Sequence, residues 1–143
     1  MVLCASQRPS FRYALINETM SRKVEAAAIG DPGMVVWWGT RVECLSGLSR
    51  RLREGTIGAE AGKQVRSLLA ELARQWHEVL PTETLRKRAE RLIMVHPLRA
   101  ADSLQPAAAL TCVREEPGGA LLASLDDNLR IAATKEGFNV VPD

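Results

Sequence analysis

Five short apolar segments alternate with longer helix-like segments along the chain, and this alternation constrains the fold more than any other feature. We expect strands at residues 1–5, 34–38, 77–80, 120–124 and 138–141. The second segment, MVVWW, is nearly continuous in β-branched and aromatic residues, as a strand buried on both faces should be. Strands that alternate with helices predict an α/β fold with a mostly parallel sheet covered by helices on both faces.

The longer segments have the periodicity of amphipathic helices. We expect helices at 18–29, 40–54, 58–76, 81–95, 99–116 and 126–137. The apolar positions of three of them are Val42, Leu45, Leu48 and Leu52, then Val65, Leu68, Leu69, Leu72 and Trp76, and then Leu85, Ala89, Leu92 and Ile93. Thr82 is expected as an N-cap. Pro106 is awkward inside a helix, but a helix start near Asp102 would keep it close to the first turn.

The length and net charge of the chain indicate one ordinary globular domain. The length of 143 residues suits a single core, and we place one domain at 1–143. The net charge of +2 is too small to indicate nucleic-acid binding by itself. The basic runs at 49–53 and 85–91 are, taken alone, more often solvated helix faces.

The cysteines indicate a reducing compartment. Cys4, Cys44 and Cys112 are odd in number and too widely spaced for a metal-ligand pair, and a secreted disulfide framework would need an even number. No signal peptide or membrane-spanning run is visible, so we expect a soluble protein of the cytoplasm. Cys44 is expected to pack in the core.

Three carboxylates fall at expected helix starts, and two of them follow expected strands. Glu43 comes one turn after the strand at 34–38, Asp102 opens the alanine-rich helix, and Asp126 follows the strand at 120–124. Each has a structural interpretation: Glu43 forms a capping box with Thr40, and acids in first turns or at N-caps stabilise helices. Gathered at one rim of the sheet, the same carboxylates would repel each other unless a hard cation such as Mg²⁺ or Mn²⁺ neutralised them.

Several stretches resemble PIN-domain proteins of the VapC toxin type. They are WWGTRVECLSGLSRRLREG, LRAADSLQPAAAL and LLASLDDNLRIAATKEGFNVV, which include Glu43, Asp102 and Asp126 in the family's order and context. Ser124 takes the family's Thr/Ser position and Leu129 follows at the expected spacing. The match covers residues 34–143.

The resemblance implies a three-layer α/β/α sandwich with a mostly parallel central sheet and a Mg²⁺- or Mn²⁺-dependent endoribonuclease activity. It also implies an antitoxin that inhibits the enzyme, and commonly a homodimer. Glu43, Asp102 and Asp126 would hold the metal ion, with Ser124, Asp127 and Asn128 as candidates for contacts through water. The candidates for guiding the RNA backbone are Arg41, Arg50, Arg51 and Arg53.

The chain departs from the family at the first strand, which normally ends in an aspartate. Cys4 or Gln7 stands there instead, and no acidic residue precedes Glu18. Three interpretations remain open. The protein binds metal with three carboxylates, it is a degenerate module that binds antitoxin or RNA without cleaving it, or its first dozen residues come from a shifted reading frame.

The histidines and tryptophans add two further expectations. His77 and His96 are too isolated to indicate a histidine-based site, and His96 is expected at the surface. Either Trp37 or Trp38 could stack a nucleic-acid base near the site, and at least one of them is expected in the core.

Overall fold

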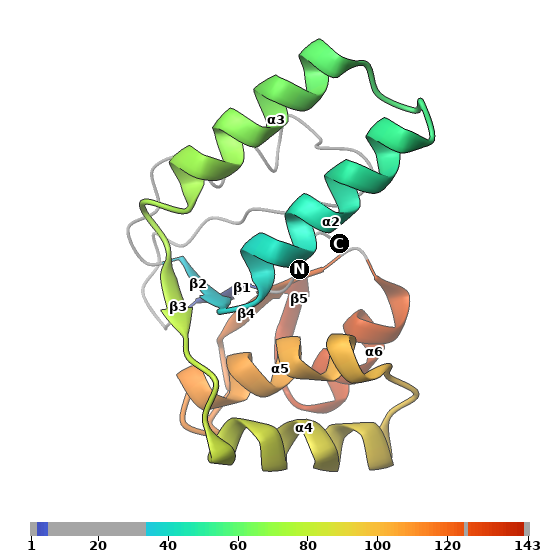
Figure 1. The fold of residues 1–143 in the computed structure, drawn as a ribbon. Helices are drawn as coiled ribbons and strands as arrows, with labels where there is room; N and C mark the ends of the chain where they lie inside the picture. Colours follow the sequence, from blue (N-terminus) through green and yellow to red (C-terminus); the bar gives the residue numbers. More distant parts are fainter. Residues whose placement is uncertain (1–2, 6–33, 125, 142–143) are drawn as a thin grey trace.

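The computed structural model describes residues 3–5, 34–124 and 126–141, in which five strands alternate with helices (Figure 1). The strands are β1 (Leu3–Ala5), β2 (Val35–Trp37), β3 (His77–Val79), β4 (Leu121–Ala123) and β5 (Asn139–Val141). The helices are α2 (Thr40–Arg53), α3 (Ala59–Leu72), α4 (Glu83–Val95), α5 (Ala100–Cys112) and α6 (Asp127–Lys135). All five predicted strands and the last five predicted helices are present, and the helix expected at 18–29 lies outside the described residues.

The strands form one sheet in the order β3-β2-β1-β4-β5. The β2–β3 and β4–β5 pairs are parallel, whereas β1 is antiparallel to both β2 and β4. Four strands therefore run in one direction and β1 runs against them. The prediction of an α/β fold is confirmed, and the sheet is mixed, since two of its four strand pairs are antiparallel. Parallel and antiparallel ladders satisfy the same backbone groups, so a short apolar pattern does not fix strand direction.

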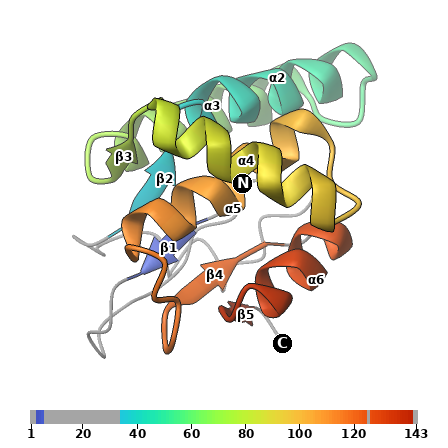
Figure 2. The same ribbon diagram turned by 90° about the horizontal axis from the view of Figure 1, so that it is seen from below.

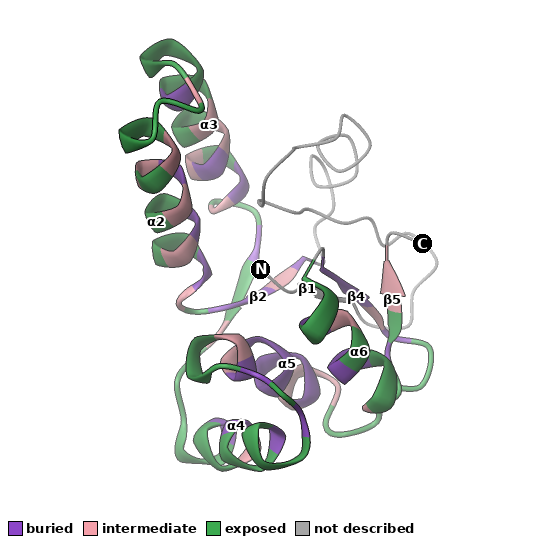
Figure 3. Cartoon of the chain, turned by 90° about the vertical axis from the view of Figure 1, so that its right-hand side faces the viewer, coloured by how far each residue is buried: buried purple, intermediate pink, exposed green. Residues whose placement is uncertain are grey.

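Two hydrophobic clusters lie on opposite sides of the sheet. Trp37 and Leu122 belong to the larger cluster, with residues of α4, α5 and α6, whereas Val36 and Ala123 belong to the smaller one, with residues of α2 and α3. This division follows from the alternation of side chains along a strand. In Figures 1 and 3, α2 and α3 accordingly lie on one side of the sheet and α4 and α5 on the other.

The buried face of α2 differs from the predicted one. Thr40, Cys44 and Leu48, at four-residue steps, are its buried residues. Among the positions predicted to face the core, only Leu48 does so: the side chains of Val42, Leu45 and Leu52 are at least 36% exposed. The prediction that Cys44 packs in the core is confirmed, and burial raises the pKa of its thiol to about 11.

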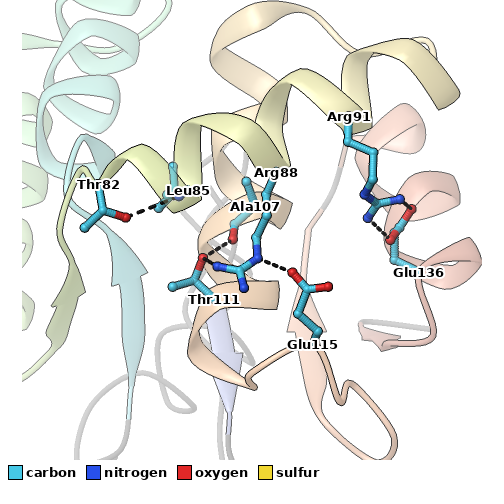
Figure 4. Close-up of polar contacts among 8 residues, drawn as sticks. All are labelled: Thr82, Leu85, Arg88, Arg91, Ala107, Thr111, Glu115 and Glu136. Atoms are coloured by element: carbon cyan, nitrogen blue, oxygen red, sulfur yellow. Dashed lines mark hydrogen bonds and ion pairs between the residues drawn. The ribbon is translucent and has the colours of Figure 1, made fainter.

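Helices α4 and α5 pack side by side (Figures 1 and 2). Thr82 caps α4 as predicted, since its hydroxyl accepts the Leu85 N–H at 3.2 Å. Small side chains on α5 allow the close approach, and Arg88 of α4 adds a hydrogen bond of 2.9 Å to the Thr111 hydroxyl (Figure 4). The inward positions predicted for α4 are confirmed for Leu85, Ala89 and Leu92, whereas Ile93 is 40% exposed.

Helix α5 begins earlier than predicted, at Ala100. Pro106 is therefore its seventh residue and lies inside the helix, so the expectation that it falls near the first turn is wrong. Proline has no backbone N–H, and the carbonyl of Asp102 consequently receives no i+4 hydrogen bond. Pro106 is fully buried, which indicates that packing offsets the lost bond.

Helix α3 ends at Leu72, four residues before its predicted end. Trp76 lies beyond it but still packs in the smaller cluster, and its indole N–H donates to Glu78 Oε1 at 3.1 Å. No helix among the described residues is both long and apolar enough to cross a membrane.

The surface position predicted for His96 is wrong. His96 is only 7% exposed because the end of α4 turns inward and its Nε2 lies 2.7 Å from Glu136 Oε1 at the end of α6. Glu136 also accepts two hydrogen bonds from Arg91 (Figure 4). This network joins the carboxyl ends of α4 and α6.

Candidate functional site

Glu43 is held at the carboxyl end of β2 by a tight strand-to-helix connection. Trp38 and Gly39 alone link β2 to α2. A Cβ atom at Gly39 would lie 2.5 Å from Nε1 of the buried Trp37 indole, so only glycine fits there. The connection places Glu43 in the first turn of α2.

The capping box predicted for Thr40 and Glu43 is wrong. Gly39 occupies the N-cap position, no side chain caps the helix, and Thr40 is already helical. The Thr40 hydroxyl is buried and has no hydrogen-bond partner in the part of the chain that the structure describes. Glu43 Oε2 instead accepts a hydrogen bond from Gln105 Nε2 of α5. The carboxylate is therefore directed across to another element.

Glu43 and Asp102 are brought close enough for their charges to interact. Burial is the main cause that raises the pKa of Glu43, the hydrogen bond from Gln105 lowers it, and the negative charge of Asp102 adds a smaller upward effect. Asp102 lies in the first turn of α5, partly exposed. Two of the three predicted carboxylates are thus within electrostatic range of each other, although they are far apart in the sequence.

Gln105 was not predicted as a site residue. It is 3% exposed and lies three residues after Asp102, on the same face of α5. A single long polar side chain within a run of buried small residues is a signal that sequence reasoning could have used. Buried amides are normally hydrogen-bonded, so such a residue indicates a polar partner on another element.

Asp126 has the structural role that was considered for it. It is the N-cap of α6, and its Oδ1 accepts the Leu129 N–H at 2.9 Å. Its own N–H donates to the hydroxyl of Ser124, which is 1% exposed, at 3.1 Å. Asp127 and Asn128 are exposed at the start of α6, where Asp127 complements the helix dipole.

The pair of Glu43 and Asp102 fits a hard divalent cation. Among the described residues, no three His, Cys, Asp or Glu side chains are grouped so as to hold a metal ion. Mg²⁺, however, often takes only one or two protein carboxylates, and a cation would relieve the unfavourable charge at Glu43. The Thr40 hydroxyl, which has no partner within the described ranges, precedes Glu43 by three residues on the same helix face. Asp126 as a further ligand stays a prediction.

The direction of β1 bears on the missing first-strand acid. Cys4 pairs with Val35 and Leu122, so its backbone lies within the sheet. Because β1 runs against β2 and β4, its carboxyl end lies at the edge opposite to the one where Glu43 follows β2. Gln7, the alternative position, lies outside the described residues.

The four candidate RNA-binding arginines occupy the two ends of α2. Arg41 is exposed in the first turn, two residues before Glu43. Arg50, Arg51 and Arg53 are in the last turn, where they complement the helix dipole, and Arg53 also donates to Ser49 at 2.6 Å. At 1.5 Å per residue, Arg53 lies about 15 Å along the axis from Glu43.

Comparisons of the chain with protein-family models, with curated proteins and with solved structures gave no match. The family resemblance therefore depends on the sequence stretches given above. The chemistry of the Glu43, Asp102 and Gln105 cluster is the starting point for a function.

Proposed function

We propose that the protein is a metal-dependent endoribonuclease of the PIN type, similar to VapC toxins, that uses Mg²⁺ or Mn²⁺. The observation that carries the proposal is the hydrogen bond from Gln105 to Glu43, which ties the carboxylate after β2 to the helix that carries Asp102. The charge of Asp102 disfavours ionised Glu43, and the buried Thr40 hydroxyl has no hydrogen-bond partner among the described residues; both features favour a cation site over a purely structural role.

The three-layer PIN-like sandwich belongs to the same proposal. Helices on both sides of a five-stranded sheet support it, as do separate hydrophobic clusters on the two faces. The reversed β1 is a departure from a wholly parallel sheet.

Each residue of the proposed site would have a separate role. Glu43 and Asp102 would hold the cation with their negative charge, and Gln105, which donates to one oxygen of Glu43, would orient that carboxylate. The bound ion would supply positive charge for the phosphoryl oxygens and activate water. Arg41 would hold a phosphate beside the pair, and the arginines at the far end of α2 would contact the RNA backbone further along.

An inhibiting antitoxin and a homodimer complete the proposal. Apolar side chains that face solvent support contacts with other proteins, because monomeric proteins rarely expose large apolar patches. On α2 these are Val42, Leu45 and Leu52, and at the end of α4 they are Ile93, Met94 and Val95.

A second candidate function is a PIN-like module that binds antitoxin or RNA without cleaving it. Two observations favour it: β1 runs against its neighbours, and Asp126 is engaged as a helix cap. A capping Asp126 leaves fewer carboxylates for one ion, and the reversed β1 directs the end of the first strand away from the edge where Glu43 lies.

An RNA cleavage assay separates the two candidates. Purified wild type should cleave RNA with Mn²⁺ or Mg²⁺ and not with EDTA, and Asp102→Asn should lower the rate at least about 100-fold. Glu90→Gln, which alters an exposed carboxylate of α4, serves as the matched control and should cleave normally. Cleavage that persists in Asp102→Asn would exclude the proposed site, and a wild type that binds RNA but never cleaves it would support the non-cleaving module.

A further inference from the structure

The structure separates three tryptophans that the sequence could not distinguish. Trp37 and Trp76 are each 7% exposed and pack in the two hydrophobic clusters. Trp38 is 51% exposed, although it directly follows β2 and neighbours Trp37. Burying a tryptophan removes roughly 150–250 Å² of surface from water, so the fold leaves a large apolar area of Trp38 exposed to solvent.

Trp38 is nevertheless held in place. Its backbone N–H donates to the Val79 carbonyl at 3.1 Å, which continues the β2–β3 pairing by one residue. Its ring meets that of Trp37 edge to face, with centroids 6.3 Å apart and planes at 71°. A rigid aromatic side chain loses little conformational entropy when a ligand stacks on it.

The surroundings of Trp38 are those of the candidate site. It follows β2 at the edge of the sheet where α2 begins; exposed Arg41 comes three residues later and Glu43 two residues after that. Because β4 runs in the same direction as β2, Ser124 directly follows β4 at the same edge, with Arg130 Nη1 donating to its carbonyl at 2.8 Å. An exposed aromatic ring at an edge that also carries arginines is a combination that binds single-stranded nucleic acid.

We infer that Trp38 is the stacking platform for an unpaired base of the RNA. The inference rests on the proposed ribonuclease function and assigns a base-binding residue to it. A base in a duplex has both faces covered by its neighbours, so it cannot stack on Trp38 unless the duplex opens. Arg41 would meanwhile contact the adjacent phosphate.

Binding in EDTA tests the inference without requiring cleavage. Affinities of wild type and Trp38→Leu for a fluorescently labelled single-stranded RNA are compared by anisotropy at one salt concentration. The loss of one stacked base should weaken binding about 5- to 150-fold. Trp38→Phe keeps a ring and should recover most of the affinity. In wild type, RNA should also change the tryptophan emission, and this change should vanish in Trp38→Phe.

Three controls distinguish stacking from other roles. Leu80→Ala removes an apolar side chain that is 59% exposed, directly after β3, and should not change RNA affinity. Duplex RNA should bind Trp38→Leu and wild type equally, and matching melting temperatures would show that the variants fold.

Equal affinity of wild type and Trp38→Leu for single-stranded RNA, or no binding by wild type, would overturn the inference and leave Trp38 as a protein-contact residue. Failure of the ribonuclease proposal differs: RNA would then bind through Trp38 without being cleaved with Mn²⁺.

Discussion

The network around Glu136 allows a quantitative prediction. Glu136→Gln removes the charge that faces both His96 and Arg91 while keeping the shape of the side chain. Figure 4 shows the contact with Arg91. The side chains of His96 and Glu136 are only 5% and 13% exposed, so their hydrogen bond to a charged acceptor is worth about 1.5–3 kcal/mol. Arg91 is 48% exposed, and its ion pair adds no more than about 1 kcal/mol.

Glutamine keeps one acceptor oxygen, so the net loss of unfolding free energy should be about 2 kcal/mol. For a chain of this size that corresponds to a fall in melting temperature of about 4–8 °C. The assay is thermal unfolding of wild type and Glu136→Gln followed by circular dichroism at pH 7. Arg91→Gln, which removes only the exposed partner, is the matched control and should lower the melting temperature less.

The pH dependence of this difference provides a second check. Burial alone would raise the pKa of Glu136, but hydrogen bonds and charges from Arg91 and His96 outweigh it and hold the pKa below its ordinary value of 4.5. The stabilisation is therefore fully present above about pH 4.5 and is lost as the pH falls through the folded-state pKa. Equal melting temperatures at pH 7, or a difference that grows on acidification, would refute this account of the network.

Two further predictions concern the site and the core. Gln105→Leu removes a donor that lowers the pKa of Glu43, so that pKa should rise further in a carboxyl NMR titration, whereas Gln64→Leu on exposed α3 surface should leave it unchanged. A pKa of Glu43 that falls in Gln105→Leu would contradict the hydrogen bond. Leu92→Ala, at a 0% exposed position, should cost about 2–5 kcal/mol in chemical denaturation, and Ile93→Ala, at 40% exposure, under about 1 kcal/mol. Similar losses of unfolding free energy in the two variants would show that α4 packs against the core with a different face.

The sequence predicted elements well because elements depend on local patterns. The apolar run MVVWW and the periodic positions of α4 determine a strand and a helix without reference to distant residues. The direction of β1 could not be predicted, since a three-residue strand pairs either way. The exposure of Val42 could not be predicted either, because the buried face of α2 depends on where α3 and the sheet lie.

The proposed site combines residues that the sequence indicated with one that it did not. Glu43 and Asp102 were identified from context, but their relation depends on Gln105, which is 62 residues from Glu43. The hydrogen bond between His96 and Glu136 spans 40 residues and was likewise missed. Contacts of this kind arise from helix packing, which a single sequence does not encode locally.

The central claim is that Glu43 and Asp102 together bind a divalent cation, and calorimetric titration with Mn²⁺ in the absence of RNA tests it most directly. Wild type and Glu90→Gln should bind with the same affinity, and both Glu43→Gln and Asp102→Asn should bind at least about tenfold more weakly. Wild-type affinity in either site variant, or no Mn²⁺ binding by the wild type, would contradict the claim.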